Sequence, residues 1–296
     1  MSPLPIPSDV IRWFRSVFAQ CNKKLARTMS LVPNVAEPSL DMAFIDHLTQ
    51  YSAPEILKSG WTVRIDTHFL GGLRHFYGKW EVADIGLLVH YRRNGKLLRS
   101  KAAVLQSKRL YPTAGPVKED MRIDYEIGFA RLADPEPAPP LYSQSSFRFD
   151  ENSRYQALVA HDDQFNAIKQ WIGQNKVPVF YQFYNPASLP WEQTFPLTKE
   201  SRKIRSYDFA TRIVRASEVL TQLSAKPKNY SPSILDLAPD PKSLGWRLES
   251  FIVDLLRCRE GHIFQDIGES EIFSLFNRRS GPIAAAVGFS VEMPAE

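Results

Sequence analysis

Three side chains that suit metal binding and hydrolysis stand at the ends of two apolar runs. Asp84 lies near the start of the first run, and Gln106 and Lys108 lie at the end of the second. Because side chains alternate across a strand, Gln106 and Lys108 point to one side and Ser107 points to the other. If Asp84 lies beside Gln106 on the neighbouring strand, a carboxylate, an amide oxygen and an ammonium meet. Such oxygen ligands suit Mg²⁺ or Mn²⁺, and a neighbouring lysine can orient an attacking water.

The two runs are predicted to form a β-hairpin over residues 80–111. They flank Asn94 and Gly95, a pair that supplies the positive backbone angles of a tight turn. Both runs are apolar at nearly every position, as expected for strands that are covered on both faces within an α/β sheet. A buried charge in such strands is costly unless it is paired or bound. Asp84 is therefore expected to hold a metal. The alternatives are a paired surface acid at Asp84 and a snorkelling side chain at Lys108.

The order of Asp84, a turn and then Gln106-Ser107-Lys108 resembles the PD-(D/E)xK nuclease superfamily. It is similar to the QxK variant of that family, which occurs in type IV restriction nucleases and in several bacterial anti-phage effectors. The resemblance implies that Asp84 and Gln106 bind the metal and that Lys108 serves catalysis. Gln106 departs from the many members that carry an acid at this position, and it lowers the negative charge of the site.

Further acids are candidates for this site. In the resembled family a glutamate on the first helix often completes the metal shell, and Glu37, at the start of the second predicted helix, is the candidate here. Asp46 and Glu55 are its rivals. Glu81 is a further catalytic candidate, but it lies three residues before Asp84, on the opposite face of a regular strand. Only a β-bulge would turn it toward the site, so a structural role fits Glu81 equally well.

The composition narrows the classes of protein that fit. With 296 residues, of which 44% are apolar, the chain can form one large domain or two modest ones. Cys21 and Cys258 lie far apart, which gives neither a disulfide framework nor a zinc spacing and suits a reducing cytoplasm. No signal-peptide pattern and no apolar run of about 18 residues occurs, so we expect no membrane segment. Neither a Walker A nor a Rossmann glycine loop is present, which argues against nucleotide triphosphate hydrolysis.

The net charge of +5 is unevenly distributed along the chain. Residues 1–130 hold 18 Lys and Arg against 12 Asp and Glu, whereas residues 131–296 hold 19 against 20. The positive excess thus lies in the half that carries the candidate site, as expected if that half faces the phosphates of DNA. A solvated surface without a partner is the alternative.

The periodicity of apolar residues predicts an α/β fold with a mixed central sheet. Residues 39–186 are predicted to give helix, strand, strand, strand, helix and strand, which is the element order of the nuclease core in the resembled family. The predicted elements around the hairpin are a helix at 39–57, a strand at 61–70, a helix at 154–175 and a strand at 177–184.

Three segments follow from this pattern. Residues 1–38 hold an N-terminal basic amphipathic helix, and residues 39–187 form the nuclease-like core. Residues 188–296 form a C-terminal extension that packs on the core or on a partner. Helices are predicted there over 199–224 and 245–259, and a closing strand over 283–291.

The leading interpretation is a cytoplasmic, metal-dependent endonuclease that cuts DNA and serves as the effector of a prokaryotic defence system. The defence role comes from the resemblance alone. No DNA-reading motif is recognisable, so other protein subunits or a homo-oligomer are expected to choose the target. The alternative is a nuclease-like subunit that has lost activity and binds DNA or serves as a scaffold. A third interpretation, a small-molecule enzyme on an unrelated α/β core, is weakened by the absence of any cofactor loop.

Overall fold

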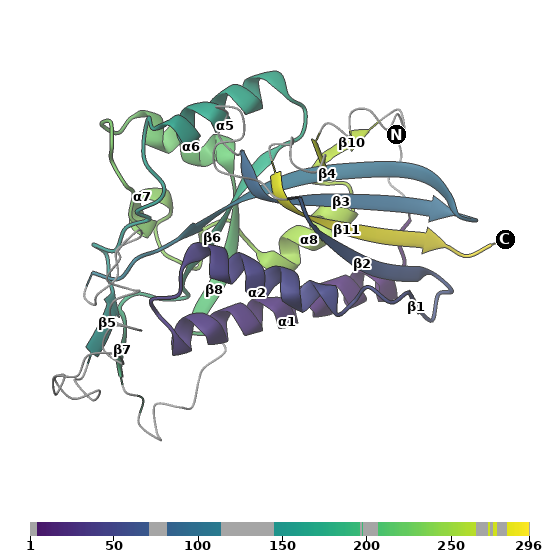
Figure 1. The fold of residues 1–296 in the computed structure, drawn as a ribbon, viewed down its shortest axis with the longest axis horizontal. Coiled ribbons are helices and arrows are strands. Elements are labelled where there is room, and N and C mark those ends of the chain that lie inside the picture. Colours follow the sequence, from purple (N-terminus) through teal and green to yellow (C-terminus); the bar gives the residue numbers. More distant parts are fainter. Residues whose placement is uncertain are drawn as a thin grey trace, which may run out of the picture.

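The computed structural model describes residues 5–70, 82–113, 145–195, 197, 207–264, 272, 275–276 and 283–295. Glu81 and the first residues of the helix predicted over 199–224 lie outside them. The described part of the chain contains six helices and eleven strands (Figure 1). The helices are α1 (Ser8–Leu31), α2 (Glu37–Thr49), α5 (Asp163–Gln174), α6 (Ala216–Ser224), α7 (Ile234–Leu237) and α8 (Leu248–Leu256).

Nine of the described strands form one mixed sheet, in the order β1-β2-β11-β3-β4-β6-β8-β9, with β10 paired to β4. They are β1 (Glu55–Ile56), β2 (Thr62–Phe69), β3 (Ala83–Arg93), β4 (Lys96–Arg109), β6 (Val179–Pro186), β8 (Phe209–Arg215), β9 (Trp246–Arg247), β10 (His262–Phe264) and β11 (Ile283–Met293). A separate pair is formed by β5 (Ser145–Phe149) and β7 (Trp191–Phe195). The predicted α/β class with a mixed central sheet is therefore confirmed.

The predicted hairpin is formed by β3 and β4. They pair antiparallel around a turn in which Asn94 and Gly95 have positive φ angles of 50° and 72°. From Ser100 to Arg109, every residue of β4 is buried. The expectation of a strand covered on both faces is thus confirmed for this part of β4, whereas alternate residues of β3 are partly exposed.

Beyond its pairing with β3, β4 continues to a second neighbour. Residues Val104 to Arg109 pair in parallel with Val179 to Tyr184 of β6. The connection between β4 and β6 contains α5, as parallel neighbours require a long crossover. The observed order α2, β2, β3, β4, α5, β6 is the predicted one, with the short strands β1 and β5 in addition. The last part of the helix predicted over 39–57 is wrong, because α2 ends at Thr49 and β1 follows at Glu55–Ile56.

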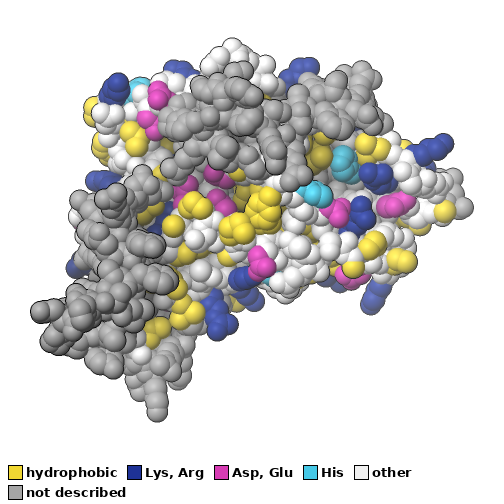
Figure 2. Space-filling model, in the orientation of Figure 1, with side chains coloured by type: hydrophobic (Ala, Val, Ile, Leu, Met, Phe, Trp, Pro, Cys, Tyr) yellow, Lys and Arg dark blue, Asp and Glu magenta, His cyan; other side chains and the backbone are white. Residues whose placement is uncertain are grey.

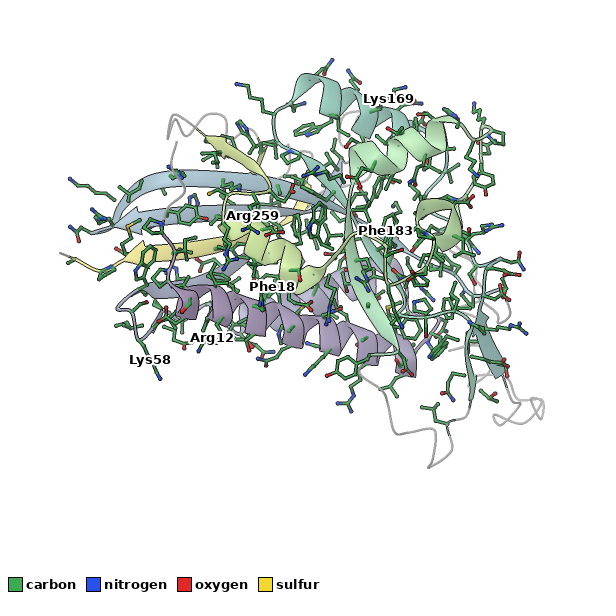
Figure 3. The ribbon with its side chains drawn as sticks, turned by 180° about the vertical axis from the view of Figure 1, so that it is seen from behind. Arg12, Phe18, Lys58, Lys169, Phe183 and Arg259 are labelled. Atoms are coloured by element: carbon green, nitrogen blue, oxygen red, sulfur yellow. The ribbon has the colours of Figure 1, made fainter. Side chains whose placement is uncertain are left out.

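Helices α1, α2 and α8 pack on one side of the sheet, whereas α5 and α6 lie beyond β4 and β6 on the other side (Figure 1). Helix α1 buries apolar residues at helical spacing, among them Phe14 and Phe18, as its amphipathic pattern predicts. Its basic residues Arg12, Arg15 and Arg27 are exposed on the outer face. Figure 3 shows Arg12 on the outer side of α1 and Phe18 on the side that faces α8.

The C-terminal residues belong to the same sheet as the predicted core. Residues before the predicted boundary at 187/188 form β6, and residues after it form β8 to β11. Strand β11 lies between β2 and β3, antiparallel to the first and parallel to the second. The two sides of the predicted boundary are therefore hydrogen-bonded to each other throughout the sheet.

The helix predicted over 199–224 is wrong in the part that the structure describes before residue 216. Residues Phe209–Arg215 form β8, and only Ala216–Ser224 are helical, as α6. The sequence of β8 is rich in β-branched residues, and the strand pairs with β6 along its whole length. Pairing with a distant strand thus outweighs the local helical pattern. Among the described helices, none is both long enough and apolar enough to cross a membrane.

Candidate functional site

Asp84, at the start of β3, contacts Gln106, which lies in the part of β4 that pairs with β6. Nε2 of Gln106 donates a hydrogen bond to Oδ2 of Asp84 at 2.5 Å. The backbone N–H of Ser107 donates to the same oxygen at 2.7 Å. The contact between Asp84 and Gln106 follows from the hairpin register, because the adjacent residues Ile85 and Leu105 are paired. The predicted neighbourhood of Asp84 and Gln106 is confirmed.

Helix α2 adds two carboxylates, Glu37 and Asp41, which stand one turn apart. Oε1 of Glu37 lies 3.5 Å from Nζ of Lys108, and Oε2 accepts a hydrogen bond from the backbone N–H of Arg109 at 3.0 Å. Oδ1 of Asp41 accepts a hydrogen bond from the Ser107 hydroxyl at 2.6 Å. The helix therefore touches three consecutive residues of β4. In the space-filling view, acidic side chains gather where α2 meets the strands (Figure 2).

Asp41 is a site residue that the sequence reasoning missed. A signal was present, because Asp41 follows Glu37 by four residues and so shares its face of a helix. The rivals proposed for Glu37 lie elsewhere. Asp46 is exposed and paired with Lys24, and Glu55 accepts a hydrogen bond from a tryptophan of α1.

Lys108 is buried and interacts with two acidic side chains. It is 3% exposed, and it forms its ion pair with Glu37. The second acid, Asp162, caps the N-terminus of α5 by accepting a hydrogen bond from the backbone N–H of Phe165 at 2.6 Å. Burial raises the pKa of Asp162, and the positive charge of Lys108 acts against this rise. Lys108 therefore lies close to both helices that flank the sheet here.

Arg109, the residue after Lys108, holds the segment that leads into α2. Its guanidinium donates to the backbone carbonyls of Pro33 and Val35 and stacks on the ring of Tyr111, 4.8 Å from the ring centre. The side chain is 1% exposed. Arg109 thereby fixes the start of the helix that carries the two site carboxylates, a role that no local pattern predicts.

The carboxylates influence one another. Burial raises the pKa of Asp41 well above its usual range, and the nearby charges of Asp84 and Glu37 raise it further. The hydrogen bonds that Asp41 accepts from Ser107 and Tyr184 act in the opposite direction. Several negative charges in one buried place favour a bound cation, which would relieve their repulsion.

Gln106 carries a buried acceptor beside these acids. Its Oε1 makes no hydrogen bond in the part of the chain that the structure describes. Buried polar atoms nearly always have a partner, so this oxygen is available to a water or another ligand. No group of three or more His, Cys, Asp or Glu side chains among the described residues is arranged to hold a metal ion. The oxygens of this site that could serve as ligands of Mg²⁺ are those of the two carboxylates, Asp41 and Asp84, and the amide oxygen of Gln106.

No protein-family model matches the sequence, and no curated protein or solved structure is similar to it at a significant level.

Proposed function

We propose that this protein is a metal-dependent endonuclease that hydrolyses DNA at the site formed by β3, β4 and α2. The observation that carries the proposal is the contact of Asp84 with Gln106, two residues before the buried Lys108. The hairpin pattern of the sequence predicts this contact. Its agreement with the QxK motif supports a nuclease of the resembled family.

The proposed roles follow from the contacts of each side chain. Asp84, Asp41 and Oε1 of Gln106 would hold Mg²⁺ or Mn²⁺. The ion would supply a Lewis acid that stabilises negative charge on the scissile phosphate and lowers the pKa of an attacking water. Lys108 would orient that water or neutralise a phosphate oxygen. Glu37 pairs with the Lys108 ammonium and holds it in place, so we assign it a positioning role, and its direct metal role stays a prediction.

The site is also arranged to exclude bulk water. Lys108, Gln106 and Ser107 are buried, and Asp84 and Asp41 retain only partial exposure. Charges in such surroundings act more strongly on a reacting phosphate than they would in water. A site of this kind needs few groups, because positioning and electrostatics supply most of the rate enhancement in phosphoryl chemistry.

The test is a cleavage assay on supercoiled plasmid with EDTA, Mg²⁺ or Mn²⁺. Wild type is compared with Lys108→Met, which removes the ammonium but keeps the apolar stem. The matched control is Lys169→Met, because Lys169 is exposed on α5 and projects away from the sheet (Figure 3). We expect cutting by wild type and by the Lys169 variant in metal only, and none by the Lys108 variant. Cutting by a folded Lys108→Met protein would remove Lys108 from the mechanism.

A second candidate function is favoured by one observation, namely that several site residues pair with one another. Gln106 donates to Asp84, and Glu37 pairs with Lys108, as in a site retained for structure alone. Such a protein would be a nuclease-like subunit that binds DNA or serves as a scaffold. Binding of a duplex that weakens steeply with salt, without cleavage in any metal, would favour this candidate.

The biological setting rests on the resemblance. A defence effector that cuts DNA inside the cell would need partner subunits or self-association to control it. We propose such partners for this chain. Purification of the tagged protein from its native host, followed by size analysis of the complex before and after nuclease treatment, separates protein partners from bound DNA.

A further inference from the structure

Tyr184 of β6 lies against the candidate site from the side of α2. Its side chain is completely buried, and its hydroxyl donates a hydrogen bond to Oδ1 of Asp41 at 2.7 Å. The hydroxyl of Ser107 donates to the same oxygen at 2.6 Å. Two hydroxyls from neighbouring parallel strands thus hold one oxygen of one carboxylate.

A buried amide fixes the direction of both hydroxyls. Nε2 of Gln182 donates to the Tyr184 oxygen and lies 3.5 Å from the Ser107 oxygen. A hydroxyl that accepts from an amide N–H directs its own hydrogen elsewhere, here to Asp41. The arrangement depends on strand register, because Gln182 is the partner of Ser107 in the sheet and Tyr184 follows on the same face.

The hydrogen bonds from Tyr184 and Ser107 engage only one oxygen of Asp41 and leave its second oxygen for another role. In the described part of the chain, Oδ1 makes both of the side-chain hydrogen bonds of Asp41, and Oδ2 makes none. The Asp84 carboxylate is near enough for its charge to act on Asp41. In many metal sites, a carboxylate that binds the metal is oriented by hydrogen bonds from neighbouring residues that do not touch the metal. Asp41 is held in the same way through one oxygen, and its other oxygen is available to a cation.

We propose that Tyr184 and Ser107 are positioning residues that orient Asp41 so that its second oxygen serves the cation held by Asp84 and Gln106. The inference rests on the proposed function, and it deepens it by naming the groups that support one ligand. A purely structural network would affect the stability of the fold and leave metal affinity unchanged once the protein is folded. The two roles are therefore distinguished by metal affinity.

The experiment compares Tyr184→Phe with Tyr155→Phe. Tyr155 is equally buried, packs on Phe183 on the other face of β6, and its hydroxyl makes no hydrogen bond among the described residues. Mn²⁺ binding to each protein is measured by electron paramagnetic resonance at a temperature where circular dichroism shows all proteins to be folded. Cleavage is measured over a range of Mg²⁺ concentrations.

We expect Tyr184→Phe to weaken Mn²⁺ binding about tenfold, since a hydrogen bond to a charged group is worth about that much. The Mg²⁺ concentration for half-maximal cleavage rises by a similar factor, and the rate at saturating Mg²⁺ stays near that of wild type. Tyr155→Phe leaves both quantities unchanged. Ser107→Ala acts like Tyr184→Phe, whereas Ser107→Thr keeps the hydroxyl and restores binding.

The outcomes separate this inference from the proposal beneath it. If wild type binds Mn²⁺ and cuts DNA, but Tyr184→Phe and Ser107→Ala do so with unchanged metal dependence, the positioning role is overturned and the nuclease proposal stands. If wild type neither binds Mn²⁺ nor cuts DNA in any metal, the nuclease proposal is wrong. The positioning role, which rests on it, is then wrong as well. Should Tyr184→Phe not fold, the comparison of Ser107→Ala with Ser107→Thr decides the question.

Discussion

Lys108 and Glu37 form an ion pair that the protein encloses. Nζ lies 3.5 Å from Oε1, and the two side chains are 4% and 9% exposed. The pair links β4 to the first turn of α2, so it joins the strand that carries the QxK motif to the helix that carries the other acids. In a buried pair, each charge depends on its partner, because neither can be solvated by water.

Glu37→Gln is therefore expected to destabilise the protein by about 3 kcal/mol, since it removes a negative charge that compensates the buried Lys108 ammonium. The control is Asp46→Asn on the same helix, which breaks the exposed pair with Lys24 and is expected to leave the free energy of unfolding nearly unchanged. Urea unfolding at pH 7 measures both. The double variant Glu37→Gln, Lys108→Met should recover much of the loss, and equal losses in the double and single variants would argue against coupling.

Asp41→Asn should abolish stabilisation by metal without harming the fold. The asparagine still accepts the hydrogen bonds from Ser107 and Tyr184, but it has no negative charge for the cation. Mg²⁺ at about 100 times its Kd is expected to stabilise wild type by about 2.7 kcal/mol and the variant by almost nothing. Thermal unfolding with EDTA and with Mg²⁺ measures the difference, with Asp46→Asn as the exposed control. An equal rise in Tm for both variants would place the metal elsewhere.

Tyr184→Phe and Tyr155→Phe should change stability in different directions. The first removes a hydrogen bond to a carboxylate and is expected to cost about 2 kcal/mol. The second removes a buried hydroxyl that has no partner among the described residues, and it is expected to be neutral or to stabilise by about 1 kcal/mol. Urea unfolding of the two variants side by side provides the measurement. A clear loss of stability in Tyr155→Phe would mean that its hydroxyl is bonded after all, through water.

Lys101 gives the protein a pH-dependent stability at alkaline pH. Its Nζ is buried and donates to the carbonyl of Leu255 near the end of α8, and burial lowers the pKa of Lys101 to about 8. Between that value and the pKa of an unfolded lysine, the unfolded chain binds more protons than the folded one. The free energy of unfolding therefore rises with pH over this window, and below it the cost of burying the ammonium is fully present.

Lys101→Met should remove this dependence. From pH 7 to pH 10, wild type is expected to gain about 1–2 kcal/mol relative to the variant, which allows for partial screening by solvent. Urea unfolding at pH 7, 8, 9 and 10 measures the difference. Lys169→Met, which changes an exposed lysine, should run parallel to wild type. A constant difference in the free energy of unfolding between wild type and Lys101→Met over this range would show that burial does not lower the pKa of Lys101.

The contact of Asp84 with Gln106 could be predicted because both residues lie on one hairpin, where the turn at Asn94 and Gly95 constrains the register. The presence of Asp41 in the site could not be predicted in the same way. Its neighbours on the chain are apolar, and its contact with Ser107 depends on how α2 crosses β4, which no local pattern records. The same limit explains β8, whose strand conformation is stabilised by pairing with β6, and Arg109, whose partners are backbone carbonyls far away in the chain.

The position of β11 also has a consequence for the synthesis of the protein. Because β11 separates β2 from β3 in the sheet, the two outer parts of the sheet cannot join until residues 283–293 have left the ribosome. Contacts between residues so distant in the sequence also slow folding, since a long loop must close before they form. The nascent chain therefore stays without its complete sheet during most of its translation, and a nuclease built in this way would become active only after nearly all of its described residues had been made.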